Sequence, residues 1–219
     1  MWDFSNFDLA SDVCELDDLI HKAKPEAVIH FAGLKAVDES ENKPILYWNN
    51  NLLSSINLLA CMIKHNITKL VFSSSDTVYG DAKTQPVTEN QDLKSNSIYG
   101  STKIAIEQLI HDVCKQNVIN AVCLRYFNPV GSHDEKIIFE SPYDHPNNLM
   151  PRIIRVALGI DEEIKIFGND YSTKDGTGER DYIHIKDLIS GHFSSIDFLK
   201  KNSGCYNINL GTGKPTSVM

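Results

Sequence analysis

The sequence predicts an α/β fold in which helices cover both faces of a doubly wound parallel sheet. Two observations support this prediction. Short apolar runs of strand length alternate with longer amphipathic stretches along the 219-residue chain, and a parallel sheet with crossover helices requires that order. Hydroxyl side chains also follow one apolar run directly, at Ser73 to Ser75. The carboxyl ends of parallel strands are where such sheets bind their ligands.

The composition is that of a folded protein. The chain is 42% hydrophobic, which allows a sizeable core at this length. Its net charge of −8 argues against nucleic acid or an anionic membrane surface as a partner. Five cysteines without a CxxC pair, and no basic-then-apolar leader, predict reduced thiols in a cytoplasmic protein. No apolar run reaches the roughly 18 residues of a membrane span.

The first elements are expected in the order helix, strand, helix. A helix capped by Ser11 precedes a buried strand at 27–32. Pro44 then opens a long helix to about His65, because proline is favourable in a first helical turn. The buried stripe of this long helix is expected to comprise Tyr47, Leu52, Ile56, Leu59 and Ile63.

The later elements follow the same alternation. A strand at 70–72 precedes a polar loop at 81–95, and Ser95 or Ser97 caps the helix that carries Tyr99. The remaining expected elements are a strand at 120–126, a helix at 149–158, strands at 164–167 and 206–210, and a helix at 187–200 with Leu188, Ile189, Phe193, Ile196 and Leu199 inward.

Tyr99 and Lys103 are the strongest chemical signal. They are four residues apart on an expected helix, so both side chains project from one face. A lysine ammonium beside a phenol favours the phenolate and lowers the tyrosine pKa from about 10. Ser75, at the end of the preceding strand, supplies a hydroxyl that can share the moving proton. Ser75, Tyr99 and Lys103 are therefore the candidate catalytic residues.

Longer motifs surround these residues. They are VIHFAGLKAV at 28–37, SSSDTVYG at 73–80, YGSTK at 99–103, LRYFNPVG at 124–131, PNNLMP at 146–151, IFGNDY at 166–171 and DGTGERDYIH at 175–184. In this order the chain resembles the UDP-glucose 4-epimerase family of the extended short-chain dehydrogenases/reductases. The resemblance implies a Rossmann-like NAD-binding domain at 1–130 and a mainly substrate-binding part at 131–219, interleaved with the last elements of the sheet.

The resemblance also implies an activity and its residues. The activity is epimerisation at C4 of UDP-galactose or UDP-glucose by transient oxidation with tightly bound NAD. Tyr99 is the implied base, Ser75 the bridging hydroxyl, and Lys103 the cation that also bonds the nicotinamide ribose. The implied cofactor-binding residues are Asp8, Leu9, Phe31, Ala32, Gly33, Lys35, Asn50, Tyr99, Lys103 and Phe127. The implied substrate-binding residues are Lys35, Ser75, Tyr99, Asn128, Asn148, Phe167 and Arg180.

The family resemblance further implies a homodimer formed through the helices at 44–65 and 99–114. No metal is expected: the segment 133–145 is rich in His, Asp and Glu but lacks a metal-ligand spacing.

Three departures from the family keep alternatives open. No glycine-rich fingerprint precedes Gly33, and the chain stops soon after the turn at 211–213, so pieces are expected to be missing at both ends. A non-catalytic remnant, serving as a binding protein or without function, is therefore one alternative. Epimerases usually carry a small residue at the position of Asp76. Nucleotide-sugar 4,6-dehydratases carry an aspartate there. A dehydratase or another sugar-nucleotide epimerase is the other alternative.

Overall fold

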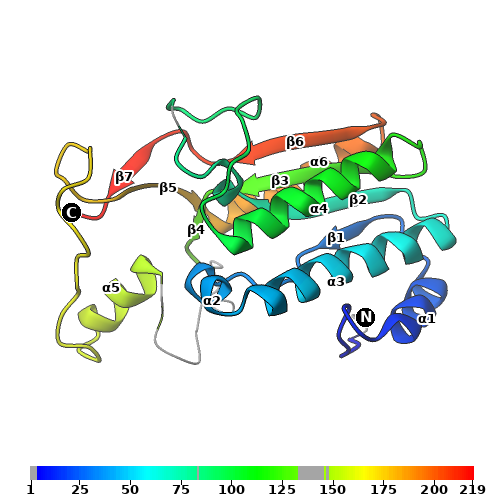
Figure 1. Ribbon diagram of the computed structural model, residues 1–219, viewed down its shortest axis with the longest axis horizontal. Coiled ribbons are helices and arrows are strands. Elements are labelled where there is room, and N and C mark those ends of the chain that lie inside the picture. Colours follow the sequence, from blue (N-terminus) through cyan, green and yellow to red (C-terminus); the bar gives the residue numbers. More distant parts are fainter. Residues whose placement is uncertain (1–3, 83, 133–145, 147) are drawn as a thin grey trace. The chain divides into compact units, whose positions relative to one another are not determined.

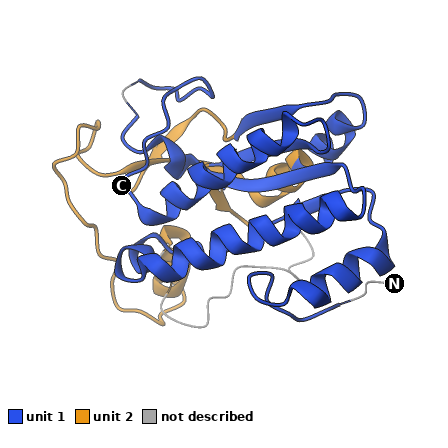
Figure 2. Cartoon of the chain, turned by 45° about the vertical axis from the view of Figure 1, so that its right-hand side comes forward, with its two compact units in different colours: residues 1–126, 192–209 blue, residues 127–191, 210–219 orange. Residues whose placement is uncertain are grey.

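The computed structural model describes residues 4–82, 84–132, 146 and 148–219. The chain divides into two compact units, coloured separately in Figure 2. Unit 1 comprises residues 1–126 and 192–209, and unit 2 comprises residues 127–191 and 210–219. Within the described ranges, no helix is both long enough and apolar enough to cross a membrane.

Unit 1 is built on a four-stranded sheet with the order β1-β2-β3-β6 (Figure 1). The strands are β1 (Val28–His30), β2 (Lys69–Ser75), β3 (Asn120–Tyr126) and β6 (Cys205–Leu210). β1 and β2 pair in parallel, as do β2 and β3. The β2–β3 register runs from Lys69 opposite Asn120 to Ser75 opposite Tyr126. Ser75 and Tyr126 therefore reach the same carboxyl edge of the sheet.

Helices cover both faces of this sheet. They are α1 (Val13–Ala23), α2 (Val37–Asn42), α3 (Pro44–Lys64), α4 (Ile98–Cys114) and α6 (Ile185–Leu199), with the short 3-10 helix η1 (Asp76–Tyr79) after β2. In Figure 1, α3 and α4 run side by side over one face, and the C-terminal part of α6 lies behind the opposite face. The predicted doubly wound α/β fold is confirmed.

The core of unit 1 lies between the sheet and its helices. Phe72 of β2 is fully buried, and it belongs to one cluster of buried side chains with Met62 of α3 and Ile106 and Ile110 of α4. Each such side chain contributes roughly 1.5–3 kcal/mol to the free energy of unfolding. This packing fixes α4, the helix that carries Tyr99 and Lys103, against the end of β2.

Unit 2 contains a small sheet with the order β4-β5-β7. Its elements are β4 (Asn128–Val130), α5 (Leu149–Ala157), β5 (Glu179–His184) and β7 (Pro215–Ser217). β4 and β5 pair in parallel, whereas β5 and β7 are antiparallel. Asp181 of β5 closes the turn before β7, because its carboxylate accepts hydrogen bonds from the backbone N–H groups of Thr212 and Gly213 at 2.9 and 2.7 Å.

Several expected elements have the expected bounds. β3 occupies residues 120–126, and Ser97 caps α4 by accepting a hydrogen bond from the Gly100 N–H at 3.0 Å. Other details are wrong. Residues 164–167 form no strand, and the N-cap of α1 is Asp12 instead of Ser11. β4, β5, β7, α2 and η1 were not predicted as elements of the fold.

The predicted buried stripes of α3 and α6 are also partly wrong. Ile56 and Ile63 of α3 are each 42% exposed, and Ile189 and Phe193 of α6 are 45% and 63% exposed. α3 instead buries a row that includes small and polar side chains, namely Tyr47, Asn51, Ser54, Ser55, Leu58, Leu59, Cys61 and Met62.

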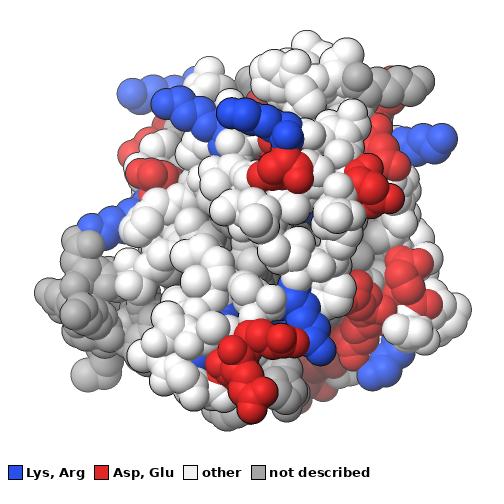
Figure 3. Space-filling view, turned by 90° about the vertical axis from the view of Figure 1, so that its left-hand side faces the viewer, with Lys and Arg blue, Asp and Glu red and all other residues white. Residues whose placement is uncertain are grey.

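The surface carries both signs of charge. On the face drawn in Figure 3, acidic and basic side chains lie next to one another at several places. The prediction that nucleic acid is not a partner rests on the net charge of −8, and it stays a prediction from the sequence.

Candidate functional site

The start of α4 is fixed by α2. The backbone N–H of Tyr99 donates to Ser40 Oγ at 3.1 Å, and that of Ile98 donates to Glu41 Oε1 at 2.7 Å. These contacts, together with the Ser97 cap, satisfy N–H groups that have no partner within the helix. The first turn of α4 is thereby held in one orientation toward the end of β2.

Lys103 is a buried cation one turn along α4 from Tyr99. Its Nζ donates to the Ser73 carbonyl oxygen at 2.7 Å and lies 5.6 Å from the centre of the Tyr99 ring. Burial lowers the pKa of Lys103 to about 8, although the Glu107 carboxylate opposes this change. The amine therefore titrates close to physiological pH.

Tyr99 carries a phenol that is harder to ionise than a free one. Burial raises its pKa to about 12; a hydrogen bond with Ser75 opposes the rise, and the charge of Asp76 adds to it. The expectation that Lys103 brings this pKa toward neutrality is wrong for the chain as the structure describes it. Desolvation of the phenolate is the largest cause of this rise.

Ser75 ends β2 and is only 8% exposed. Its Oγ accepts hydrogen bonds from the Thr77 hydroxyl at 3.0 Å and from the Thr77 backbone N–H at 3.3 Å, and donates to Asp76 Oδ1 at 3.3 Å. The sequence analysis did not identify Thr77 as part of this site. Ser75, Tyr99 and Lys103 are nonetheless brought together at the carboxyl edge of β2, as the sequence predicts.

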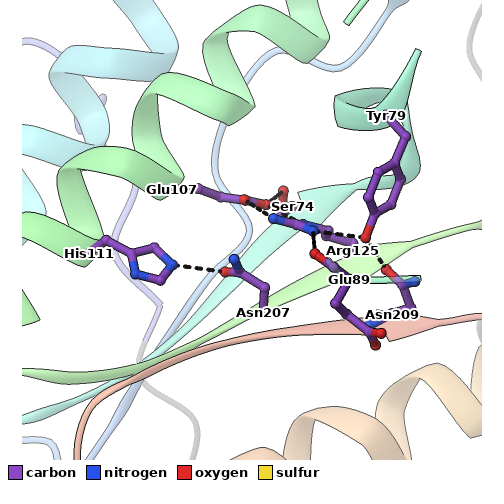
Figure 4. A network of polar contacts seen from close by, with 8 residues as sticks. All are labelled: Ser74, Tyr79, Glu89, Glu107, His111, Arg125, Asn207 and Asn209. Atoms are coloured by element: carbon purple, nitrogen blue, oxygen red, sulfur yellow. Dashed lines mark hydrogen bonds and ion pairs between the residues drawn. The ribbon is translucent and has the colours of Figure 1, made fainter. Parts of the chain in front are cut away.

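A buried ion pair lies behind this edge. Arg125 of β3 and Glu107 of α4 are 1% and 2% exposed, and two parallel hydrogen bonds of 2.6 and 3.0 Å join them (Figure 4). Glu107 also accepts from Ser74 Oγ at 2.5 Å, and Arg125 donates to the Tyr79 hydroxyl at 2.8 Å. The network therefore ties α4, β2, β3 and η1 together.

This pair was missed from the sequence although a signal was present. Arg125 stands in a strand whose neighbours Cys123 and Leu124 are apolar, and a charged side chain within a buried strand requires a buried partner. The sequence alone does not say which acid supplies it.

A groove of about 370 Å³ opens beside β1 and α3 in unit 1. Its lining includes the predicted cofactor residues Asp8, Leu9, Ala32, Gly33 and Asn50. The sequence predicts these residues to share a ligand, and the structure places all of them on one groove. The remaining lining residues are Ser5, Phe7, Leu19 and Ser54.

Asn51, next to Asn50, holds the loop at the edge of this groove. Its side chain accepts from the Leu34 N–H at 2.8 Å and donates to the Leu34 carbonyl oxygen at 3.1 Å and to Thr102 Oγ1 at 3.0 Å. Asn51, and not its neighbour Asn50, therefore fixes this loop. Gly33 has φ +149°, and a Cβ there would lie 3.1 Å from Asn51 Oδ1, so this close approach favours glycine.

Phe31 and Lys35, on either side of Gly33, are exposed. The Phe31 ring is 57% exposed, and its centre lies 4.8 Å from that of His192. Neither side chain takes part in the core, so both are accessible for binding.

The other predicted binding residues belong to unit 2. Phe127 and Asn128 follow β3, and Asn128 Oδ1 is a buried acceptor without a hydrogen-bond partner in the described part of the chain. Phe167 is 72% exposed, which argues against a core role. Arg180 is exposed on β5, and its Nη1 donates to the Glu179 carbonyl oxygen at 2.9 Å. Asn148 occupies the N-cap position of α5.

The described residues contain no cluster of three or more His, Cys, Asp or Glu side chains that could hold a metal ion. The segment 133–145, considered above for metal ligands, lies outside the described residues.

Known proteins match almost the whole chain. The model of the NAD dependent epimerase/dehydratase family matches residues 3–211. A UDP-glucose 4-epimerase of Dictyostelium discoideum is 47% identical over 219 residues, covering 99% of this chain and 63% of the relative. One from Mus musculus shows the same identity and coverage. The chain thus spans slightly less than two thirds of the length of these curated relatives.

Solved structures agree with the sequence matches. The UDP-glucose 4-epimerase of Stenotrophomonas maltophila, with bound NAD and formylated UDP-arabinopyranose, has a TM-score of 0.94 at 42% identity, covering 98% of this chain and 64% of that one. The enzyme of Bifidobacterium longum, in complex with NAD+ and UDP, has a TM-score of 0.92 at 44% identity and the same coverage. Since the family match covers most of the sequence, the chain belongs to the NAD dependent epimerase/dehydratase family.

Proposed function

We propose that this chain epimerises a UDP-hexose at C4, interconverting UDP-galactose and UDP-glucose with tightly bound NAD. One observation supports the proposal above others. Ser75 at the end of β2 and Tyr99 and Lys103 on α4 meet at one edge of the sheet, with Lys103 Nζ held 2.7 Å from the Ser73 carbonyl oxygen. This set is suited to moving a proton to and from an alcohol.

We infer that residues 1–130 form the NAD-binding domain. The groove beside β1 fits a dinucleotide, because it combines Asp8, which can accept hydrogen bonds from a ribose, with apolar Leu9 and the open backbone of Gly33. The residues assigned to NAD are Asp8, Leu9, Phe31, Ala32, Gly33, Lys35, Asn50, Tyr99, Lys103 and Phe127.

The part at 131–219 is assigned mainly to the UDP-sugar, with Asn128 just before it. The Oδ1 of Asn128, which has no hydrogen-bond partner among the described residues, is suited to accept a hydrogen bond from a ligand. Exposed Arg180 offers a charge-assisted contact to a diphosphate. The residues assigned to the substrate are Lys35, Ser75, Tyr99, Asn128, Asn148, Phe167 and Arg180.

The chemistry follows from the substrate. The C4 carbon carries no acidic proton, so the alcohol is inverted through a ketone. NAD supplies a hydride acceptor that returns the hydride to the other face of the sugar. Tyr99 takes the hydroxyl proton as the alcohol is oxidised and gives it back as the alcohol re-forms. Ser75 hydrogen-bonds the same oxygen, and Lys103 stabilises negative charge on the phenol.

Product analysis tests this proposal. The purified chain, supplied with NAD and UDP-galactose, is expected to form UDP-glucose, followed by proton NMR of the sugar. Tyr99→Phe is expected to lose nearly all of this activity while retaining the fold, measured by circular dichroism. Equal activity in Tyr99→Phe would assign the proton transfer to another group.

Asp76 favours a second candidate, a nucleotide-sugar 4,6-dehydratase. Its carboxylate is half-buried beside Ser75, where an acid could assist the loss of water. The product separates the two candidates: a dehydratase forms a 4-keto-6-deoxy sugar instead of a C4 epimer, and the same NMR spectra distinguish them.

The chain is further proposed to act as a homodimer in the cytoplasm. α3 exposes an apolar row, Ile45, Leu46, Leu53, Ile56 and Ile63, of the kind that a second copy covers. The five cysteines are all free thiols, which is typical of a reducing compartment.

A further inference from the structure

Phe31 is a large aromatic side chain that stays on the surface next to the groove. Its ring is 57% exposed, and it directly precedes Ala32 and Gly33, which line the groove. A surface ring that is free to rotate loses side-chain entropy when a ligand orders it. Whatever holds the Phe31 ring before binding therefore raises the affinity for a ligand that contacts it.

The strand pattern directs Phe31 and Tyr126 to the same face of the sheet. The preceding residues point to the other face, because His30 contacts α3 and Arg125 contacts α4. Successive residues of an extended chain point to opposite faces. Phe31 and Tyr126 therefore point toward the face behind which the C-terminal part of α6 lies (Figure 1).

His192 of α6 contacts both of these side chains. The centre of its ring lies 4.8 Å from that of Phe31 and 5.4 Å from that of Tyr126. Both distances fall within the roughly 4.5–7 Å at which aromatic rings attract one another. A hydrogen bond also joins His192 Nε2 to the Tyr126 hydroxyl. His192 therefore connects the residue after β1 to the end of β3.

His192 gives Phe31 a fixed surface to pack on. It is 2% exposed, and close packing leaves a buried side chain few alternative rotamers. The hydrogen bond with Tyr126 further sets the orientation of the imidazole. An exposed phenyl ring in contact with this surface is held more narrowly than one surrounded by water.

We propose that His192 is a positioning residue for cofactor binding, whose buried ring holds the exposed ring of Phe31 in the orientation that the cofactor contacts. The inference rests on the proposed function in that Phe31 is assigned to NAD. Its consequence is that His192 raises the affinity for NAD by acting through Phe31, without contacting NAD itself.

Two substitutions separate the ring of His192 from its hydrogen bond. His192→Phe keeps an aromatic ring but does not bond the Tyr126 hydroxyl, whereas His192→Gln keeps a polar group at that distance and removes the ring. His111→Gln is the matched control, because His111 lies in the last turn of α4 and contacts Asn207 (Figure 4). Circular dichroism compares the fold of all variants.

Fluorine NMR reads Phe31 without any ligand. With 4-fluorophenylalanine at position 31, a fluorine–proton nuclear Overhauser effect to the His192 ring is expected in the otherwise unsubstituted chain. His192→Gln is expected to move the resonance toward that of the free amino acid, while His192→Phe and His111→Gln leave it displaced. A missing Overhauser effect, or an unchanged resonance in His192→Gln, would overturn the proposal whether or not NAD binds.

Calorimetric titration with NAD tests the consequence. Loss of one aromatic pair in His192→Gln should weaken NAD binding about two- to tenfold, and His192→Phe should remain within about twofold of the unsubstituted chain. The double variant of Phe31→Leu and His192→Gln should bind NAD no more weakly than Phe31→Leu alone, because His192 acts through Phe31.

Additive losses in the double variant would overturn the proposal while leaving the cofactor site in place. A chain that shows the fluorine contact but binds no NAD would overturn the proposed cofactor site and, with it, the role of His192 in NAD binding. The two failures are therefore distinguishable.

Discussion

Asn50 and Asn51 are adjacent on α3 but have different surroundings. Asn50 lines the groove, whereas Asn51 is 1% exposed and forms hydrogen bonds with Leu34 and Thr102. We expect Asn51→Ala to lower the free energy of unfolding by about 2–3 kcal/mol, because it leaves buried backbone groups unpaired. Asn50→Ala should change it by less than about 0.5 kcal/mol. Urea unfolding of both variants measures the difference, and equal losses would contradict these assignments.

His30 is a buried imidazole at the end of β1. Its Nε2 lies 3.0 Å from Ser55 Oγ, and burial, with a further contribution from Lys103, lowers its pKa to about 4 from 6.5. Between pH 6.5 and about 4, His30 is therefore protonated in the unfolded chain and neutral in the folded chain. Stability associated with His30 is complete above pH 6.5 and is lost as the pH falls toward 4.

We expect this titration to cost about 2–3 kcal/mol of unfolding free energy between pH 7 and pH 4. The loss should be absent from His30→Gln and retained in His21→Gln, which changes an exposed histidine. Urea unfolding at several pH values gives the slope of the unfolding free energy against pH for the unsubstituted chain and for each variant. The same slope in His30→Gln as in the unsubstituted chain would assign the acid sensitivity to other groups.

At the scale of elements, the pair of Glu107 and Arg125 joins α4 to β3 (Figure 4). Removing one partner leaves the other charged and buried. We expect Glu107→Gln to lower the free energy of unfolding by about 3–5 kcal/mol. Asp112→Asn, which breaks the exposed pair with Lys115 at the C-cap of the same helix, should cost less than about 0.5 kcal/mol. Thermal or urea unfolding measures both losses. A loss in Glu107→Gln as small as that in Asp112→Asn would contradict this account of the buried pair.

The sequence predicted α4 and β3 well because each is determined locally. Ser97 and the apolar period define the helix, and an unbroken apolar run defines the strand. β5 was missed because Glu179, Arg180 and Asp181 have little strand preference. This strand forms through its pairing with β4 and β7, which local sequence does not show.

The opposite error occurred at residues 164–167 and on α3. Alternating Ile164 and Ile166 predict a strand, but a strand also needs a partner, and these residues form no ladder. On α3, small side chains such as Ser54 and Ser55 are buried, while Ile56 is exposed. Small residues let a helix pack closely on its neighbours, so hydrophobicity alone placed Ile56 and Ile63 wrongly in the buried stripe, although Tyr47 and Leu59 are buried as predicted.

At the scale of the molecule, the exposed row on α3 predicts self-association. Ile56 is 42% exposed in the middle of this helix, and Ile56→Glu places a charge in the proposed interface, where burying it is unfavourable. We expect a dimer to become a monomer in sedimentation velocity. Val118→Glu, which changes an exposed apolar residue in the loop after α4, should leave the dimer intact. A monomer before any substitution would contradict the proposed interface.

At the candidate site, the sequence predicted the residues whose spacing forms a motif and missed those whose role depends on the fold. Ser75, Tyr99 and Lys103 come together as their spacing predicts, because β2 and α4, separated by η1 and a loop, pack in one core. Thr77, Asn51 and Arg125 were missed, since their roles depend on which groups the fold brings next to them. The phenol pKa was predicted in the wrong direction because burial, which local sequence does not reveal, raises it.

The most direct test of the account is the NAD content of the purified chain, released by denaturation and quantified enzymatically, with and without prior incubation with NAD. The groove at Asp8, Leu9, Ala32, Gly33 and Asn50 and the buried Lys103 predict near-stoichiometric cofactor after incubation. No retained NAD, even after incubation with a large excess, would contradict the proposed cofactor site and the epimerisation that depends on it.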